Sequence, residues 1–385
     1  MQPLRHGACA HIDRQAIAHN LQTLQHRMGL EKTGRSPRIW AIVKADAYGH
    51  GLEHAVPALQ AADGLAVLSA SEAYRCRQLG WSKPILIMGD QQLTRDELSD
   101  PALYPLHWVV EHEGQINQLE SLASVLQPHV WLRFTGNLHH AGFQAHHYRP
   151  AYARLQALSA AGRLGGIGHF QHYANAEDPE QLAAERQLFA QLTIGLPGPV
   201  STENSAALLL SARAAANTDW LRVGLALYGV SPLPGLDGAA LGLKPAMAFQ
   251  APIYGIQELQ AGDSVGYGST FRAERPLRIG LVQCGYADGY PRAATLGCPV
   301  HVPGGMAGIV GRVSMDTLSI NLDQHPHIVP GHQVTLWGRP ELPVENVALA
   351  AATIAPQLLT GLTARVPRVA QTPETPASQP DKRHQ

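Results

Sequence analysis

The sequence predicts an α/β fold in which an N-terminal (β/α)8 TIM-type barrel is followed by a C-terminal, mostly-β domain. Three observations support this prediction. A chain of 385 residues is long enough for two domains of ordinary size. From about residue 38 to 232, short apolar runs alternate with longer amphipathic segments, which is typical of parallel βα units. From about 245 to 345, helical patterns are absent and Gly, Pro, Val and other β-branched residues dominate.

Eight segments of the first region have the length and composition of buried strands. Ala- and Leu-rich segments between them, such as QLAAERQLFAQL, space their apolar residues as helices packed on a sheet do. Eight repeats favour a closed barrel over the alternative, an open doubly wound sheet. The predicted strands are 39–43, 65–68, 84–88, 106–110, 130–134, 167–170, 200–204 and 220–224.

The predicted domain boundaries follow the change in pattern. The barrel should span 8–240 and the β-rich domain 241–370, with a helix near 344–359. Runs such as LRIGLVQCG and GIVGRVSMDTLSINL, separated by turn residues, indicate the strands of the second domain. The remaining segment, 371–385, is polar and Pro-rich, so we expect a disordered tail.

Composition excludes several functional classes. The 29 basic and 30 acidic side chains are scattered and give a formal net charge of -1, so no nucleic-acid partner is expected. The four cysteines form no CxxC pair, which argues against a zinc knuckle or a disulfide framework. The adjacent histidines at 139–140 and 146–147 lack an HExxH motif, so no metal site is expected. Without a secretory signal or a long apolar run, we expect a cytoplasmic protein with no membrane partner.

Candidate site residues lie where the predicted strands end, because barrel active sites form at the C-terminal ends of the strands. Lys44 follows the first strand in AIVKADAYGHG, beside a Gly-rich turn. Partial burial there would lower the pKa of its amine and make it available as a Schiff-base amine, although a surface lysine is the alternative. His169 and Arg222 end the sixth and eighth strands.

The last two loops of the predicted barrel are candidates for binding a phosphate. Such loops often offer a hydroxyl and backbone N–H groups to an anion. Turn or capping roles are the alternative. The candidates are Asn204, Ser205, Gly224 and Leu225.

Four motifs together resemble a known family: AIVKADAYGHG, VGYGSTF, GYADGYPR and GRVSMD. In order and spacing, from about residue 10 to 369, the sequence resembles the alanine racemases, which are fold-type III pyridoxal-phosphate enzymes. The resemblance implies a pyridoxal 5'-phosphate Schiff base on Lys44, with Tyr48 and Ser205 at the phosphate and Arg222 at the pyridine nitrogen. Because a guanidinium donates to that nitrogen without protonating it, we expect a weak electron sink and few side reactions.

Racemisation needs one acid/base group on each face of the substrate carbon. Lys44 serves one face, and the resemblance implies Tyr267 on the other, with His169 as its hydrogen-bond partner. In the family the β domain reaches into the neighbouring subunit, so a head-to-tail homodimer with composite sites is implied. The resemblance also implies Met315, whose backbone amide would hold the substrate carboxylate, with Asp316 beside it and with Tyr286 and Arg312 at the entrance.

Three residues near the predicted site differ from the family pattern. In VWLRFTGNLHHAGF, Arg133 replaces a lysine that is often carbamylated. His140 replaces an arginine that contacts the cofactor and the substrate carboxylate, so carboxylate binding should weaken or depend on pH near neutrality. Pro356 replaces a tyrosine at the phosphate, which opens the pocket beside the substrate.

The sequence therefore predicts an alanine racemase, an isomerase that supplies D-alanine for peptidoglycan or serves alanine catabolism. A racemase with shifted specificity, for serine or another small amino acid, is the alternative. Retention of Lys44, Tyr267, His169 and Arg222 disfavours a non-catalytic descendant. A fold-type III decarboxylase is disfavoured too, because such enzymes generally place an acid where Arg222 is expected.

Overall fold

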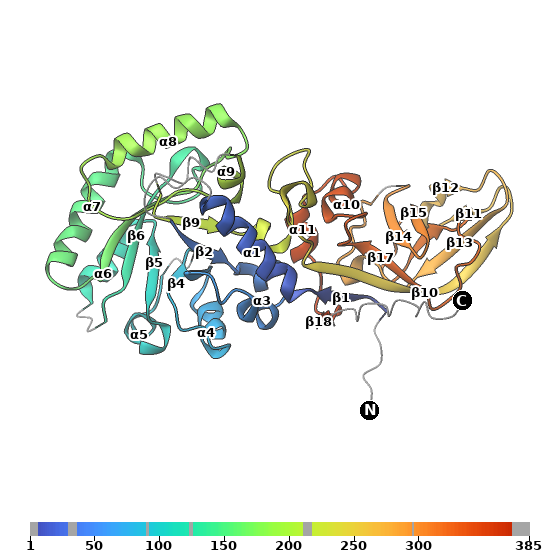
Figure 1. Ribbon diagram of the computed structural model, residues 1–385, viewed down its shortest axis with the longest axis horizontal. Helices are drawn as coiled ribbons and strands as arrows, with labels where there is room; N and C mark the ends of the chain where they lie inside the picture. The colour runs from blue at the N-terminus through green and yellow to red at the C-terminus, as the bar shows by residue number, and fades with distance from the viewer. Residues whose placement is uncertain are drawn as a thin grey trace, which may run out of the picture.

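The computed structural model describes residues 7–29, 37–89, 92–122, 126–210, 218–294 and 296–371. The molecule is elongated, with a barrel at one end and a β-rich domain at the other (Figure 1). The helix nearest the junction in Figure 1 is α11 (Ala355–Thr360). The predicted disordered tail lies outside the described residues, apart from Gln371.

The barrel has eight parallel strands in the order β8-β7-β6-β5-β4-β3-β2-β9. It closes where Asp219 N donates to Val200 O at 2.8 Å and Arg222 N donates to Glu203 O at 2.9 Å. The prediction of a closed parallel barrel is confirmed, and each predicted strand overlaps an observed one. These are β2 (Arg38–Ile42), β3 (Gly64–Val67), β4 (Ile85–Ile87), β5 (Leu106–Val110), β6 (His129–Phe134), β7 (Gly166–Gln171), β8 (Val200–Ser201) and β9 (Trp220–Val223).

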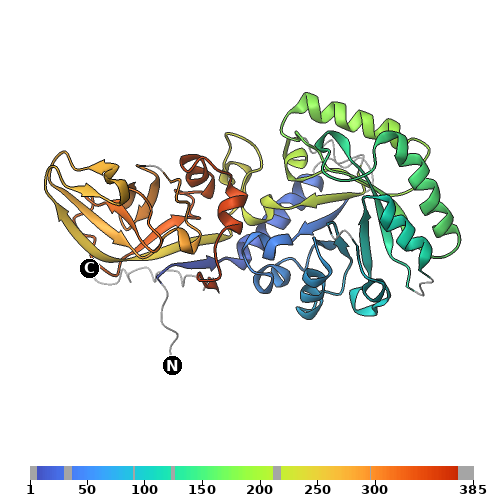
Figure 2. The ribbon, with the colours of Figure 1, turned by 180° about the vertical axis from the view of Figure 1, so that it is seen from behind.

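The longer helices lie outside the strands, as both ribbon views show (Figures 1 and 2). The helix that begins at Pro179 is capped by a side chain: Asp178 Oδ1 accepts from the amides of Glu180 and Gln181 at 3.0 and 3.1 Å. The helices of this domain are α1 (Arg14–Gly29), α2 (Lys44–Tyr48), α3 (Leu52–Ala58), α4 (Ala70–Gln78), α5 (Arg95–Ser99), α6 (Glu113–Ser121), α7 (Ala145–Ala160), α8 (Pro179–Thr193) and α9 (Ser205–Leu210), with the 3-10 turns η1 (Pro101–Leu103), η2 (Gly136–Leu138) and η4 (Leu225–Tyr228).

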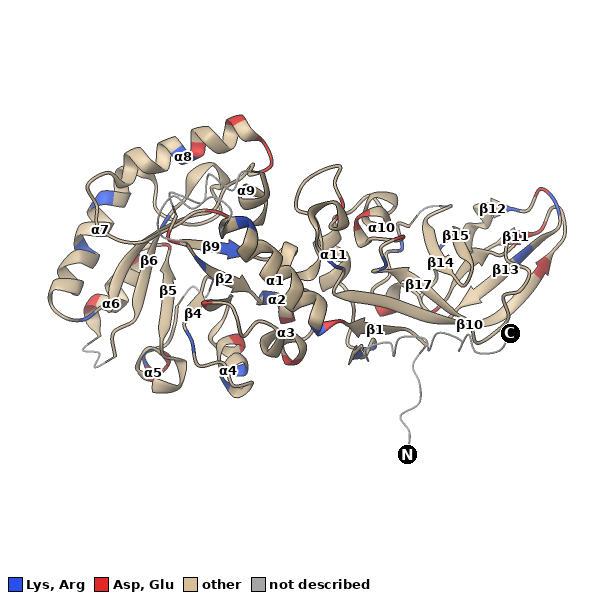
Figure 3. Ribbon diagram, viewed as in Figure 1, with Lys and Arg blue, Asp and Glu red and all other residues tan. Residues whose placement is uncertain are grey.

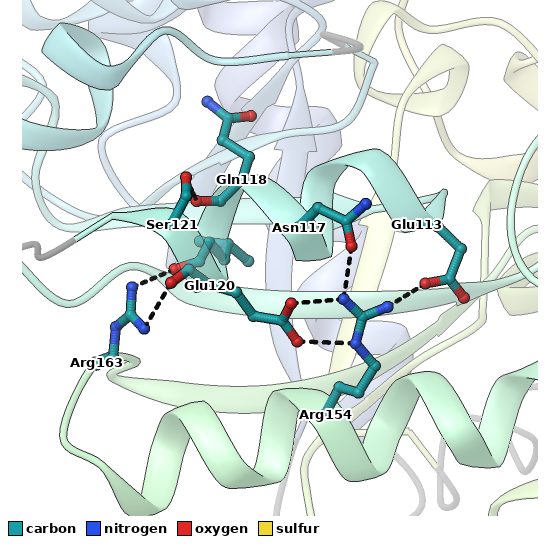
Figure 4. Close-up of polar contacts among 8 residues, drawn as sticks. Glu113, Asn117, Gln118, Glu120, Ser121, Arg154 and Arg163 are labelled. Atoms are coloured by element: carbon teal, nitrogen blue, oxygen red, sulfur yellow. Dashed lines mark hydrogen bonds and ion pairs between the residues drawn. The ribbon is translucent and has the colours of Figure 1, made fainter.

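An arginine network fixes α7 against α6 (Figure 4). Arg154 on α7 donates to both carboxylate oxygens of Glu120 at 2.8 and 2.7 Å and to Asn117 at 2.6 Å. It also pairs with Glu113, and Arg163 donates to the carbonyls that end α6. The carboxylates are largely exposed, so each pair contributes only about 0.2–1 kcal/mol, and the network mainly sets the helix register.

Large aromatic rings fill the barrel interior near the N-terminal ends of the strands. Trp40 and Trp220 stack with their ring centroids 4.0 Å apart, and Trp131 lies edge-on to Trp40. Neighbouring strands carry glycine where the rings need space. A Cβ at Gly64 would lie 2.1 Å from Trp40, and one at Gly168 would lie 2.4 Å from Trp131. The interior is therefore a packed core below the site rather than a channel.

The β-rich domain contains an eight-stranded sheet in the order β13-β16-β15-β14-β17-β10-β1-β18. Its long strand β10 also pairs with β13, so the sheet closes on itself. Two short strands, β11 (Ser264–Val265) and β12 (Phe271–Arg272), form a hairpin at the end remote from the barrel (Figure 1). The other strands are β1 (Cys9–Ile12), β10 (Met247–Leu259), β13 (Leu277–Val282), β14 (Pro299–Val302), β15 (Gly305–Val310), β16 (Leu318–Asn321), β17 (Gln333–Trp337) and β18 (Arg368–Ala370).

Two details of the second domain differ from the sequence predictions. The prediction placed residues from 8 onward in the barrel, but β1 pairs with β10 and β18 and so belongs to the second sheet. The single helix expected near 344–359 is two helices, α10 (Val344–Ala350) and α11. Pro356 lies in the first turn of α11, a position that tolerates proline, whereas a continuous helix would lose a backbone hydrogen bond there.

Several general features bear on the excluded classes. Cys9, Cys76, Cys284 and Cys298 are all free thiols. Basic and acidic residues are interspersed over both domains (Figure 3). Across the described ranges, no three His, Cys, Asp or Glu side chains are grouped so as to hold a metal ion. In the same part of the chain, every helix is too short or too polar to cross a bilayer.

A pair of histidines under the Trp rings makes stability depend on pH. His107 and His129 stack with centroids 4.5 Å apart, and Trp131 Nε1 donates to His107 Nδ1 at 3.0 Å. Burial, chiefly, lowers the pKa of His129 from 6.5 to about 4 and that of His107 to about 2. The unfolded chain therefore binds more protons than the folded one below about pH 6.5, and stability falls as the pH falls toward about 4.

We predict that His129→Phe reduces this acid sensitivity. Phenylalanine keeps a ring over Gly166 and cannot be protonated, so about 1–2 kcal/mol less stability should be lost between about pH 7 and about pH 5. The measurement is chemical unfolding at the two pH values. His26→Phe, at an exposed position of α1, is the control. Equal pH sensitivity in the His129→Phe and native proteins would contradict the assignment.

Candidate active site

A cavity of about 720 Å³ lies at the C-terminal ends of the barrel strands. Residues in the loops that follow β2, β8 and β9 line it, as the position of active sites in such barrels predicts. The structure therefore brings most of the barrel candidates together. Those that line the cavity are Lys44, Tyr48, His140, Asn204, Ser205, Arg222, Gly224 and Leu225, with Arg133 and Pro356 among the remaining lining residues.

Lys44 is placed by an unusual left-handed turn. Ala45, Asp46, Ala47 and Tyr48 have φ angles of 55, 52, 57 and 52°. Each non-glycine residue in this conformation costs about 1–2 kcal/mol, so surrounding contacts must hold the turn. Glu72 accepts from the Ala45 amide at 2.9 Å, and Asp46 accepts from the Leu52 amide at 3.1 Å. The turn directs both Lys44 and Tyr48 to the cavity.

The second domain clamps the same turn from outside. Gly49, which ends the turn with a φ of 77°, lies so close to α11 that a Cβ would be 2.1 Å from Leu359 O. Arg368 of β18 donates to Gly49 O at 3.1 Å and also binds the carbonyls of Leu362, Thr363 and Val366. The geometry of the lysine turn therefore depends on the packing of the two domains.

The environment of Lys44 favours the neutral amine. Burial lowers its pKa from the ordinary value, and the positive charge of Arg133 lowers it further. The carboxylate of Glu72 acts in the opposite direction. A larger fraction of the amine is therefore unprotonated near neutrality, which is the form that attacks a carbonyl carbon or accepts a proton.

The candidate phosphate site is formed where Ser205, Gly224 and Tyr48 meet. Ser205 Oγ accepts from the Gly224 amide at 3.0 Å. A Cβ at Gly224 would lie 2.7 Å from Tyr48 Oη, so only glycine leaves this corner of the cavity open. Burial raises the pKa of Tyr48 to about 12, and its hydroxyl therefore remains a donor at neutral pH. Hydroxyl groups and backbone amides of this kind suit an oxyanion.

Arg222 is buried and held almost completely by protein acceptors. Nη1 donates to Ser201 O at 2.7 Å and Nη2 donates to Gln171 O at 2.6 Å. Its guanidinium lies 4.0 Å from the centroid of the Phe170 ring. Burial lowers the pKa of Arg222 to about 9, so the group stays cationic at neutral pH. Of the three side-chain nitrogens of Arg222, only Nε has no hydrogen-bond partner among the described residues. Nε is therefore the one donor that remains for a ligand in the cavity.

The prediction for His169 is wrong. His169 is buried outside the strands, where its Nδ1 is 2.9 Å from Tyr148 Oη and its Nε2 is 3.2 Å from Leu196 O. Successive residues of a strand face opposite sides, and Phe170, not His169, faces the barrel interior. His172 lines the cavity together with His140, and sequence reasoning missed His172. Because inward-facing and outward-facing side chains alternate along β7, the residue two positions after the inward-facing Phe170 should also face inward, and this residue is His172.

His172 is a neutral acceptor in this site. Burial, followed by the charge of Arg222, lowers its pKa to about 3. Arg222 Nη2 lies 3.3 Å from its Nδ1, an interaction that needs an unprotonated imidazole nitrogen.

The candidates in the second domain lie on its surface, away from the cavity. Tyr267, in η6 (Tyr267–Ser269) between β11 and β12, is 70% exposed and does not line the cavity. Tyr286, in η7 (Tyr286–Asp288), donates its amide to Ser314 O at 3.0 Å and so lies beside the loop of Met315. Within one chain, the β11–β12 hairpin that carries Tyr267 lies at the end of the second domain remote from β2, the strand that Lys44 follows (Figure 1).

The same loop carries the other two candidates. Arg312 lies close to the Tyr267 turn, because a Cβ at Gly268 would be 3.1 Å from its Nη1. Asp316 pairs with Arg365 at 2.7 Å. These residues form an exposed surface that we call the β-domain face, defined as Tyr267, Tyr286, Arg312, Met315 and Asp316.

Comparisons with known proteins agree along nearly the whole chain. Residues 12–232 match the alanine racemase N-terminal domain, and residues 246–370 match the alanine racemase C-terminal domain. An alanine racemase of Bordetella petrii is 42% identical over 367 residues, covering 93% of this chain and 97% of the relative. One from Methylibium petroleiphilum is 42% identical over 363 residues, covering 92% and 96%.

Solved structures give the same result. The biosynthetic alanine racemase of Pseudomonas aeruginosa is 37% identical, with a TM-score of 0.86, covering 95% of this chain and 100% of the other. The alanine racemase of Acinetobacter baumannii is 32% identical, with a TM-score of 0.84 and the same coverage. The two domains, the barrel cavity with its strand-end lysine and these matches establish that the chain belongs to the alanine racemase family.

Proposed function

We propose that this chain is an alanine racemase that interconverts L- and D-alanine with pyridoxal 5'-phosphate held by Lys44. The observation that carries the proposal is the joint placement of Lys44, Arg222 and the Ser205–Gly224 corner in one cavity. The names of the relatives, all alanine racemases, supply the substrate.

The cavity suits this cofactor at three of its functional groups. Lys44 offers an amine whose pKa is lowered by burial for its aldehyde. Ser205, Tyr48 and the amides of Gly224 and Leu225 suit its phosphate, in the corner that a Cβ at Gly224 would fill. Arg222 offers a single cationic N–H for its pyridine nitrogen, and Asn204 lines the same wall.

When bound, pyridoxal phosphate withdraws electrons from an attached amino acid and so acidifies the hydrogen on Cα. Because Arg222 donates a hydrogen bond and keeps its own proton, it leaves that withdrawal weak. Lys44 Nζ would take a proton from Cα, or return one, on the face of Cα that it occupies.

Inversion requires a second acid/base group on the opposite face of Cα, and we propose Tyr267 from a partner subunit. The 70% exposure of Tyr267 and its place on the β-domain face support this. His172, neutral and in the cavity, offers the imidazole that the prediction assigned to His169. In a head-to-tail homodimer, the partner's face would add Met315 N–H for the substrate carboxylate, with Asp316 beside it and with Tyr286 and Arg312 at the entrance.

In cells we place the enzyme in the cytoplasm, where it would supply D-alanine for peptidoglycan or serve alanine catabolism. A racemase of broader specificity, accepting serine or another small amino acid, is the second candidate. Pro356 favours it, because the side chain that lines the cavity at this position is small and has no polar group.

The proposal predicts exchange of the α-hydrogen with solvent. In deuterium oxide, L-alanine should become D-alanine and gain deuterium at Cα, measured by mass spectrometry and chiral chromatography. Serine and larger amino acids, tested alongside, separate the two candidate specificities. Absence of Cα deuterium with every substrate would remove both.

Lys44→Ala should abolish the visible absorbance band of the lysine-bound cofactor and racemisation together, because no other cavity group forms that bond. Lys244→Ala, at an exposed lysine, should leave both unchanged. A Lys44→Ala protein that keeps the band would contradict the assignment.

Tyr267→Phe should keep the cofactor band and lower kcat by about 10²–10⁴-fold, the usual contribution of a general acid/base. Mixing this variant with Lys44→Ala should restore activity, because a hybrid dimer has one site with both groups intact. Random mixing of the subunits predicts about a quarter of native activity. The two variants are unfolded, mixed and refolded together so that their subunits exchange. If this mixture is as inactive as each variant alone, the sites are not shared between subunits.

A further inference from the structure

Arg133 is a second guanidinium in the cavity, and its position is specific. It shares the inward face of β6 with Trp131 and lines the cavity one layer above that ring. In the closed ring of eight strands, β6 lies four strands from β2 in either direction. Arg133 therefore faces Lys44 across the site.

The two cavity arginines differ in how their donors are used. All terminal nitrogens of Arg222 bind protein acceptors. Arg133 makes one side-chain hydrogen bond, from Nη1 to Glu111 Oε1 at 2.8 Å. In the described part of the chain, its Nη2 and Nε have no partner, although its side chain is only 15% exposed. A guanidinium with donors left over in a shielded cavity is suited to bind a carboxylate.

The surroundings fix this arginine without neutralising the cavity. Glu111 binds Nη1 of Arg133, and the ring of Phe170 lies near both guanidinium groups, with its centroid 5.8 Å from Arg133 Cζ and 4.0 Å from Arg222 Cζ. The charge of Arg133 still depresses the pKa values of Lys44, His172 and Arg222, so its field reaches across the site. An anionic group between Lys44 and Arg133 would offset that excess positive charge.

We propose that Arg133, held by Glu111, binds the carboxylate of the amino-acid substrate. This inference rests on the proposed racemase function and names the residue that orients its substrate. The family resemblance assigns the carboxylate contact to position 140, but His140 is exposed at the cavity wall and has no fixed partner in the described residues. Arg133 is buried deeper and is permanently charged, so it is the better anchor of the two.

The test compares two ligands that each carry half of alanine. Propionate has the carboxylate without the amine, and isopropylamine has the amine without the carboxylate. In the holoenzyme, Arg133→Gln should raise the dissociation constant of propionate and the KM of alanine about tenfold or more, because a hydrogen bond to a charged group is lost. The cofactor absorbance band and the isopropylamine affinity should not change. Arg154→Gln, on the outer face of α7, is the matched control.

Two further variants separate binding from folding. Arg133→Lys keeps the charge but loses the planar fork, so it should recover part of the propionate affinity. Glu111→Gln should weaken propionate binding in the native background and have no effect when combined with Arg133→Gln, as expected if it acts only through that side chain.

Two outcomes would overturn the inference. One is native propionate affinity in Arg133→Gln. The other is an altered cofactor band with both ligands weakened equally, which would place Arg133 on the cofactor ring oxygen instead. Deuterium exchange by the native enzyme is measured separately. Exchange together with either outcome would refute this inference and leave the proposed function standing.

Discussion

The left-handed turn that follows β2 is the constraint on which the site depends. A single turn of Ala45 to Tyr48 in this conformation is unfavourable by several kcal/mol, taking about 1–2 kcal/mol for each residue. The turn persists because Glu72 of α4 accepts a hydrogen bond from the Ala45 amide, while α11 and Arg368 of the second domain contact Gly49. The site is therefore a property of the two domains together, although the cavity lies in only one.

The cavity is built to keep positive charge in a shielded place. The cavity is lined by Lys44, Arg133 and Arg222. Glu111 is not among the lining residues and contacts the group through its hydrogen bond with Arg133. Such a set is unfavourable when it is bare, because burial disfavours each charged form. A ligand that brings a phosphate and a carboxylate would reverse this penalty. Burial, which is the main cause of the lowered pKa of Lys44, would thus also favour an anionic ligand beside the two arginines.

Much of this arrangement can be predicted from the sequence, because the barrel strands are short apolar runs separated by amphipathic helices. The segment 106–110 coincides with β5, and Lys44 follows β2 as expected. His169 was misassigned because strand ends are uncertain by a residue or two, and such a shift exchanges the inner and outer faces. The placement of β1 was missed because pairing between the two ends of a chain leaves no local pattern. Tyr267 stands out in the sequence by its motif, but no local pattern indicates that its side chain is exposed in the second domain, away from the cavity of the same chain.

The pairing of β1 has a consequence for the order in which the protein folds. Ala10 lies beside Arg368, so β1 is completed by a strand that is synthesised after the whole barrel. The barrel can collapse during synthesis, since its strands pair with near neighbours in sequence. Strand β1 has no strand to pair with until β10 and then β18 have been synthesised. Because Arg368 also binds Gly49 O, the turn that carries Lys44 is held as the structure shows it only after β18 has been synthesised and the β-rich domain has folded.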